Sequence, residues 1–142
     1  MRIYSFTSMQ ISELEPSKVK NQSIYERVNR QAAAGTSQFL IHVNRTEAGY
    51  LAFIHRPDIK TGVLYEVFVL PEFRCRGIGT RLVAYAENMS QHAGYSRVRL
   101  DACAFDASVT EAWLRSWYQK FGYTVASDGT GEYEKWLESS KG

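Results

Sequence analysis

One segment near the middle of the chain constrains the fold more than any other: an apolar run that leads through a glycine-containing turn into an amphipathic pattern. Residues Val63–Leu70 are almost wholly apolar, which is typical of a central strand buried on both faces. The turn that follows reads Arg74-x-x-Gly77-x-Gly79, and from Gly79 onward apolar side chains recur at helical spacing. The sequence therefore predicts a buried strand, a tight turn and a helix in direct succession.

The turn has the features of a phosphate-binding site. Glycines permit close backbone approaches, and the first N–H groups of a helix have no partner within the helix. Together with the positive end of the helix dipole, these donors favour a phosphate or pyrophosphate. Arg74, Arg76 and Arg81 add positive charge around the turn. A plain strand, turn and helix without a ligand is the alternative.

Two common phosphate-binding motifs do not fit this turn. A P-loop requires a lysine before Ser or Thr, whereas Gly79 is followed by Thr80 and Arg81. A dinucleotide-binding fingerprint requires a third glycine where Leu82 stands, and it usually opens a fold instead of lying in mid-chain.

The segment instead resembles the coenzyme A loop of the GNAT acetyltransferase superfamily. The resemblance includes the preceding Val69-Leu70-Pro71-Glu72-Phe73 and the amphipathic helix after the turn. A second match, Trp117-Tyr118-Gln119-Lys120-Phe121-Gly122-Tyr123, is similar to the family's helix-ending Tyr-x-x-x-Gly-aromatic signature, and glycine suits the residue that follows a helix. The two matches cover the cofactor-binding half of the family pattern, about half of this chain; the N-terminal half is similar only in its element order.

The resemblance implies acetyl-CoA as the cofactor. The pyrophosphate would rest on the amides of Arg76–Thr80, and the pantetheine arm would lie along Val67–Val69 like an extra strand, where an amide N–H would also polarise the thioester carbonyl. Cys75 is interpreted as a spacer and not as a nucleophile, because relatives transfer the acyl group directly. On this basis the cofactor-binding residues are Val67, Phe68, Val69, Arg74, Cys75, Arg76, Gly77, Ile78, Gly79 and Thr80.

Tyr118 and Glu66 are the candidate catalytic residues. In relatives the tyrosine at this position lies near the thioester sulfur and can protonate the departing thiolate, and an ordinary tyrosine pKa of about 10 keeps it protonated at neutral pH. Packing at the edge of an apolar helix face is the alternative. Glu66 is the only charge within Val63–Leu70, so it could act as a base toward the incoming ammonium, directly or through water. Alternatively it pairs with Arg97 or Arg99 on a neighbouring strand.

The chain departs from the family pattern at one position. Relatives often carry an asparagine two helical turns before the tyrosine, where this chain has Glu111. A carboxylate there could repel the cofactor or attract a cationic amine. The histidines at positions 42, 55 and 92 lack the spacing of metal ligands, so no metal is expected.

Length and composition set further bounds. A chain of 142 residues suits one domain with its own core, residues 1–142. The N-terminal segment is too short and polar for a signal peptide, and no apolar run reaches the length of a membrane span. Cys75 and Cys103 do not make a disulfide framework, which favours a reduced, cytoplasmic location. A net charge of +2 is too small to argue for nucleic acid as a partner.

Periodicity and turn residues predict the order strand, helix, three strands, helix, strand, helix, two strands. The strands are expected over Arg2–Thr7, Phe39–Val43, Gly49–His55, Val63–Leu70, Arg97–Cys103, Tyr123–Ala126 and Tyr133–Leu137. The helices are expected over Ser12 to about Ala34 with a break near Pro16, from Gly79 to Gly94, and from a cap at Asp106 or Ser108 to Gly122. This is the order of the GNAT acyl-CoA N-acyltransferase fold, an α+β (three-layer α/β) architecture with a central mixed, mostly antiparallel sheet flanked by helices.

The leading functional hypothesis is an acetyl-CoA-dependent N-acetyltransferase that moves an acetyl group to a primary amine by direct transfer in a ternary complex. The acceptor could be a small molecule or a protein amine, in a pocket formed by the N-terminal helices, the loop Arg56–Gly62 and the final hairpin. Two alternatives stay open: a CoA-binding sensor or interaction module without turnover, and a toxin-like acetyltransferase of aminoacyl-tRNA. Aromatic residues near the C-terminus are compatible with a homodimer.

Overall fold

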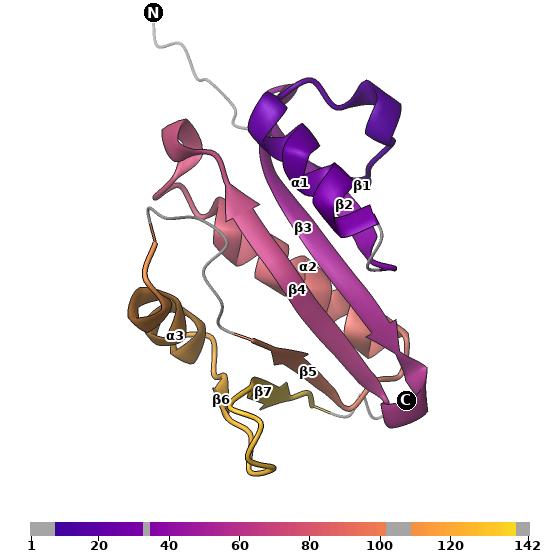
Figure 1. Ribbon diagram of the computed structural model, residues 1–142, viewed down its shortest axis with the longest axis vertical. Coiled ribbons are helices and arrows are strands. Elements are labelled where there is room, and N and C mark those ends of the chain that lie inside the picture. Colours follow the sequence, from indigo (N-terminus) through magenta and orange to yellow (C-terminus); the bar gives the residue numbers. More distant parts are fainter. Residues whose placement is uncertain (1–7, 33–34, 102–108, 139–142) are drawn as a thin grey trace, which may run out of the picture.

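The computed structural model describes residues 8–32, 35–101 and 109–138. A seven-stranded sheet in the order β1-β2-β3-β4-β5-β7-β6 organises the chain (Figure 1). The strands are β1 (Met9–Glu13), β2 (Ser37–Val43), β3 (Thr46–Arg56), β4 (Thr61–Val69), β5 (Arg97–Leu100), β6 (Thr124–Val125) and β7 (Tyr133–Trp136). The α-helices are α1 (Gln22–Ala32), α2 (Ile78–His92) and α3 (Glu111–Gln119).

The sheet is mixed and mostly antiparallel. Each neighbouring pair of strands is antiparallel except β4 and β5, which run parallel because α2 connects them across one face. β4 stands in the middle of the strand order, in agreement with its apolar sequence. The predicted fold class, an α+β sheet flanked by helices, is confirmed.

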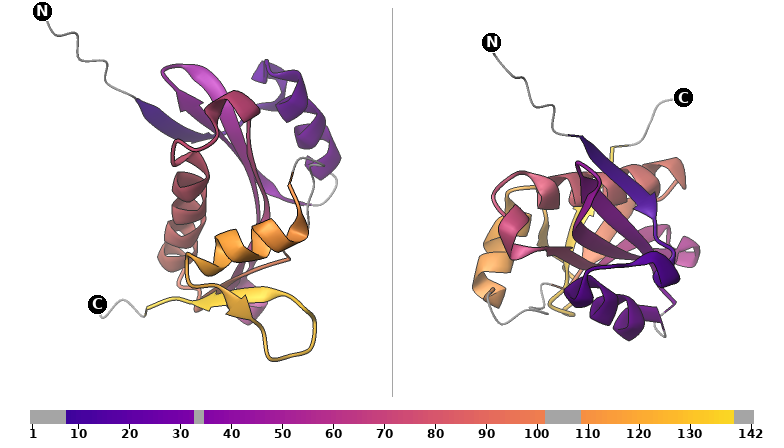
Figure 2. Two further views of the ribbon diagram at one scale, coloured as in Figure 1. Left: turned by 90° about the vertical axis from the view of Figure 1, so that its left-hand side faces the viewer. Right: turned by 90° about the horizontal axis from the view of Figure 1, so that it is seen from above.

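Helices cover both faces of the sheet. Figure 2 shows α1 on one face and α2 on the other, with α3 crossing the edge of the sheet between them. Beneath α1, a buried apolar cluster consists of Ile24, Val28, Leu40, Tyr50, Ala52, Phe68 and Leu70. A larger cluster beneath α2 includes Leu64, Leu82, Val83, Val98, Leu100 and Tyr118. Within the described ranges no helix is long and apolar enough to cross a membrane.

The N-terminal prediction is partly wrong. The expected strand Arg2–Thr7 lies outside the described residues, and the expected helix start at Ser12 falls in β1, which pairs with β2 from Met9 opposite Val43 to Glu13 opposite Phe39. The apolar residues Met9 and Ile11 alternate with polar neighbours, and this period of two suits an edge strand better than a helix. The continuous helix therefore begins only at Gln22, after a short 3-10 turn at Pro16–Lys18.

The start of α3 also differs from the expectation. Thr110 is its N-cap, and the Thr110 hydroxyl accepts a hydrogen bond of 3.1 Å from the amide of Trp113. The expected caps, Asp106 and Ser108, and the end of the expected strand at Cys103 lie outside the described residues.

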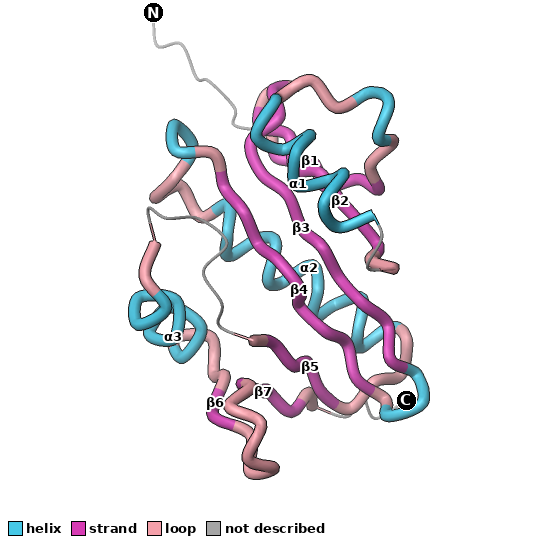
Figure 3. Tube along the Cα trace, viewed as in Figure 1, coloured by secondary structure: helices cyan, strands magenta, loops and turns pink. Residues whose placement is uncertain are grey.

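β4 and β5 pair over a short length only. The parallel ladder joins Thr61–Leu64 to Arg97–Leu100, and β4 then continues to Val69 paired with β3 only. Figure 3 shows the two strands diverging, with the turn into α2 at the end of β4 and α3 standing beyond the opening. This divergence exposes one backbone edge of β4 inside the molecule, and the candidate site forms there.

Candidate active site

A β-bulge in β4 sets which way its side chains point. Ala52 of β3 pairs with Glu66, but its neighbour Phe53 pairs with Leu64, so Tyr65 is an extra residue on β4. The extra residue reverses the alternation. Leu64 packs in the cluster beneath α2, whereas Glu66 faces α1 on the opposite side of the sheet.

The last residues of β4 turn backbone groups toward the opening. The Leu70 amide donates to the Ala48 carbonyl of β3 at 2.9 Å. Because backbone groups alternate along a strand, those of Phe68 also face β3, and those of Val67 and Val69 face away from β3. The Val69 carbonyl accepts a 3.1 Å hydrogen bond from Nε of Arg74, which ties the following turn to the strand.

The turn after β4 presents backbone donors at the start of α2. Cys75 and Gly77 have left-handed backbones, with φ of 63° and 77°. The first helical bond runs from the Arg81 amide to the Gly77 carbonyl at 3.1 Å. The amides of Ile78, Gly79 and Thr80 therefore have no partner inside the helix, and the helix dipole places partial positive charge there. This is the geometry expected of an anion-binding turn.

A cleft of about 570 Å³ joins these features. Its lining includes Glu66, Val67, Phe68, Val69, Arg74, Cys75, Gly77, Ile78, Gly79, Thr80 and Tyr118. Every catalytic and cofactor-binding residue predicted from the sequence thus lies on the cleft except Arg76. Arg76 is exposed, with its guanidinium carbon 5.6 Å from the centre of the Phe73 ring.

Glu66 is buried, with 4 % of its surface exposed, and α1 holds it. Oε1 accepts a hydrogen bond from Nε2 of Gln31 at 2.9 Å, and Oε2 lies 3.3 Å from Nε of Arg27. Arg27 in turn lies over the Phe68 ring, with its guanidinium carbon 3.6 Å from the ring centre. The adjacent cation and the hydrogen bond offset the cost of burying the carboxylate.

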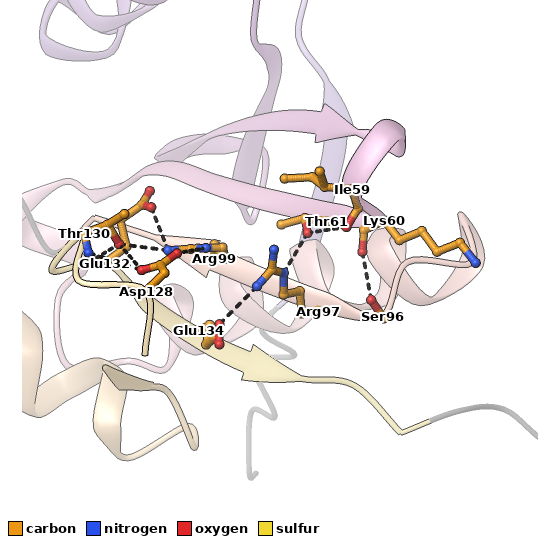
Figure 4. Close-up of polar contacts among 10 residues, drawn as sticks. All are labelled: Ile59, Lys60, Thr61, Ser96, Arg97, Arg99, Asp128, Thr130, Glu132 and Glu134. Carbon is orange, nitrogen blue, oxygen red and sulfur yellow. Dashed lines mark hydrogen bonds and ion pairs between the residues drawn. The ribbon is translucent and has the colours of Figure 1, made fainter. Parts of the chain in front are cut away.

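The predicted ion-pair partners of Glu66 are wrong. Figure 4 shows that Arg97 and Arg99 form ion pairs with other acidic residues. Arg97 contacts Glu134 at 3.3 Å, and Arg99 contacts Asp128 at 2.7 Å and Glu132 at 2.8 Å. Both arginines brace β7 and its hairpin because they lie on β5, where the ladder to β7 ends at Leu100 opposite Tyr133.

Tyr118 is buried at the wall of the cleft. Its ring makes edge contacts with Trp117 and Tyr123, at centroid distances of 4.9 and 5.8 Å. Burial and, second, the negative charge of Glu66 raise the pKa of Tyr118 well above the ordinary tyrosine value. The hydroxyl therefore carries its proton throughout the physiological pH range, as a proton donor must.

The sequence analysis missed Arg27, Gln31 and Trp113. Arg27 and Gln31 are four residues apart on α1, so they share a helix face. A charged residue beside the buried stripe of Ile24 and Val28 was the available signal, because such a position needs a buried partner of opposite charge. Trp113 lines the cleft from the first turn of α3.

The loop Arg56–Gly62 and the final hairpin, expected around the acceptor, are not among the described lining residues.

Comparison with known proteins agrees with this geometry. The model of the acetyltransferase (GNAT) domain matches residues 35–125, well over half of the chain. The chain therefore belongs to the GNAT acetyltransferase family, whose members use acetyl-CoA. Among curated protein sequences, none matches this chain.

Solved structures share the fold over nearly the whole chain. PaiA N-acetyltransferase from Thermoplasma acidophilum, in complex with coenzyme A, is 16% identical, covering 92% of this chain and 99% of its own, with a TM-score of 0.62. A GNAT acetyltransferase from Elizabethkingia anophelis with acetyl-CoA bound is 13% identical over 91% and 98%, with a TM-score of 0.68. The ribosomal-protein-S18-alanine N-acetyltransferase from Escherichia coli is 15% identical over 89% of each chain, with a TM-score of 0.62.

Proposed function

We propose that this protein is an acetyl-CoA-dependent N-acetyltransferase that moves the acetyl group to a primary amine by direct transfer in a ternary complex. One observation carries the proposal: a single cleft contains an anion-binding turn, an open backbone edge of a strand, a buried carboxylate and a buried tyrosine. Acetyl transfer from a thioester to an amine needs these four elements to bind the donor, orient it, accept a proton and return one.

The residues present fit acetyl-CoA. The amides of Ile78, Gly79 and Thr80 would hold the pyrophosphate, beside the positive charge of Arg74 and Arg76. Val67 and Val69 would pair with the pantetheine arm because their backbone groups face the opening, and Phe68 would contribute its ring. When bound, acetyl-CoA supplies an acetyl group activated as a thioester.

Glu66 and Tyr118 have opposite proton roles in this proposal. Glu66 would accept a proton from the incoming ammonium, directly or through water, through the carboxylate that Gln31 and Arg27 hold in place. The Tyr118 hydroxyl, which is protonated at neutral pH, would donate its proton to the departing sulfur, and the second proton that the amine nitrogen loses as the amide forms would restore it. Cys75, which is exposed, has no step assigned, because direct transfer needs no acyl-enzyme.

Thiol release from acetyl-CoA, measured with a panel of primary amines and with mass detection of the acetylated product, tests the proposal. We expect steady release that depends on the amine and that persists in Cys75→Ser. Saturable acetyl-CoA binding without release would instead identify a CoA-binding module. Loss of turnover in Cys75→Ser, with a labelled enzyme thiol in the wild type, would replace direct transfer by a covalent route.

A further inference from the structure

Residues from both faces of the sheet line the cleft. The anion-binding turn leads into α2 on one face, whereas Arg27, Glu66 and Phe68 approach the cleft from the face that α1 covers. In Figure 2, α3 spans the gap, beginning on the side of α1 and ending on the side of α2. If the turn holds the donor on the side of α2, the α1 side is left for the acceptor amine.

Trp113 is the third residue of α3, and Figure 2 shows the first turn of this helix on the side of α1. Its side chain lines the cleft, yet 55 % of its surface is exposed. A large aromatic ring that is both exposed and part of a cleft offers an apolar face to a ligand.

The Trp113 ring packs against a second aromatic ring of α3. It stacks on Trp117, with centroids 6.1 Å apart and planes 12° from parallel. Trp117 is itself fixed by an edge contact with Phe121 at 4.8 Å and by close approach to Gly79. A ring that is already fixed loses little conformational freedom when a ligand stacks on it, which favours binding.

Two acidic residues accompany this aromatic surface. Tyr65 and Phe68 of β4 line the same cleft with Glu66 between them in sequence. Asp101 directly follows β5 and also lines the cleft. Arg27 balances Glu66, so Asp101 leaves these three lining charges net negative, which favours a cation there.

We propose that the acceptor is an amine carrying a flat aromatic group, which stacks on Trp113 while its ammonium approaches Glu66. This rests on the proposed function, and it specifies the acceptor class for the same site. Trp113 is then a specificity-determining residue. It takes no part in proton transfer.

A matched pair of amines tests the proposal: 2-phenylethylamine and 2-cyclohexylethylamine, which share the amine, the linker and the ring size but differ in the flat π-face. For the wild type we expect kcat/KM to favour the phenyl compound by about three- to tenfold. Trp113→Leu should abolish the preference, Trp113→Phe should retain much of it, and acetyl-CoA affinity should stay unchanged. Trp136→Leu, at an exposed tryptophan of β7 that is not among the described lining residues, is the control and should keep the full preference.

The outcomes separate this proposal from the proposed function. Equal kcat/KM values for the two amines, or a preference that survives Trp113→Leu, would overturn the aromatic-acceptor proposal while acetyl transfer stands. Weaker acetyl-CoA binding in Trp113→Leu would place the ring against the cofactor and would also overturn it. An absence of acetylation with every amine, despite bound acetyl-CoA, would overturn the proposed function itself.

Discussion

Gly79 in the first turn of α2 lies against the indole ring of Trp117 on α3. A Cβ atom at Gly79 would stand 2.9 Å from Cζ2 of Trp117, closer than a real side chain tolerates. The two glycines of the turn therefore have different structural roles. Gly77 provides a left-handed backbone, with φ of 77° and open space beside it, whereas Gly79 lets α3 approach the turn.

Gly79→Ala should disturb the stacked pair Trp113 and Trp117 but keep the rest of the fold. The added methyl group displaces Trp117, and Trp113 stacks on that ring. We expect altered near-ultraviolet circular dichroism from the tryptophans and a loss of stability of about 1–3 kcal/mol, the usual cost of overpacking. A spectrum identical to that of the wild type would show that Trp117 does not pack on the turn.

Gly77→Glu should abolish acetyl-CoA binding, and Gly77→Ala is its matched control. Both variants pay the same backbone strain of about 1–2 kcal/mol, because both put a side chain on a left-handed residue. Only the glutamate brings a negative charge to the amides of α2. Calorimetric titration should therefore detect binding to Gly77→Ala and none to Gly77→Glu. Equal affinities would argue against phosphate binding at this turn.

The Arg27–Glu66 pair should behave as a buried ion pair. The two side chains are 9 % and 2 % exposed. Arg27→Met leaves the Glu66 carboxylate without this cation, and we expect a loss of about 3–5 kcal/mol in urea unfolding. The double variant Arg27→Met with Glu66→Gln removes both charges and should recover most of that loss. Additive losses would show that the pair is not coupled.

Local sequence was enough to predict the strand, turn and helix from Glu66 to Thr80. These residues are contiguous, and the apolar run, the two glycines and the amphipathic pattern after them each give a local signal for one element. The partners of Glu66 could not be predicted in the same way. They depend on the bulge at Tyr65, which reverses the face that Glu66 occupies, and on how α1 packs across the sheet. The expected partners on the neighbouring strand, Arg97 and Arg99, are wrong because β5 pairs with β4 only as far as Leu64 and the two arginines contact the acidic residues of β7 and its hairpin instead.

The hairpin between β6 and β7 should lose stability in acid. Hydrogen bonds from Arg99 and then from Thr130 hold the pKa of Asp128 well below its usual range. A lowered folded pKa stabilises the folded state above the unfolded value, and this stabilisation is lost as the pH falls through the folded value. Asp128→Asn should lower the thermal midpoint at about pH 7, with a difference from the wild type that shrinks below about pH 4. A difference that stays constant with pH would contradict the ion pair.

Tyr118→Phe tests the proton donor. The substitution removes the hydroxyl and keeps the ring contacts with Trp117 and Tyr123. We expect turnover to fall at least about tenfold, since a general acid commonly contributes a factor of about 100 or more. Acetyl-CoA affinity should hardly change, because the proposed contacts come from the backbone of Val67, Val69 and the turn. Such a pattern marks an interaction made in the transition state and not in the ground state.

The pH dependence provides a second readout of the same residue. A proton donor is lost as the pH rises through its pKa, and burial together with Glu66 raises the pKa of Tyr118 above the ordinary value of about 10. Wild-type turnover should therefore not decline between neutral pH and about pH 10 through loss of the Tyr118 proton. Any decline within that range should also appear in Tyr118→Phe. Tyr25→Phe, at an exposed tyrosine of α1, is the control and should match the wild type. If Tyr118→Phe turns over at the wild-type rate where chemistry is limiting, another group or water supplies the proton, and the cofactor-binding assignment is unaffected.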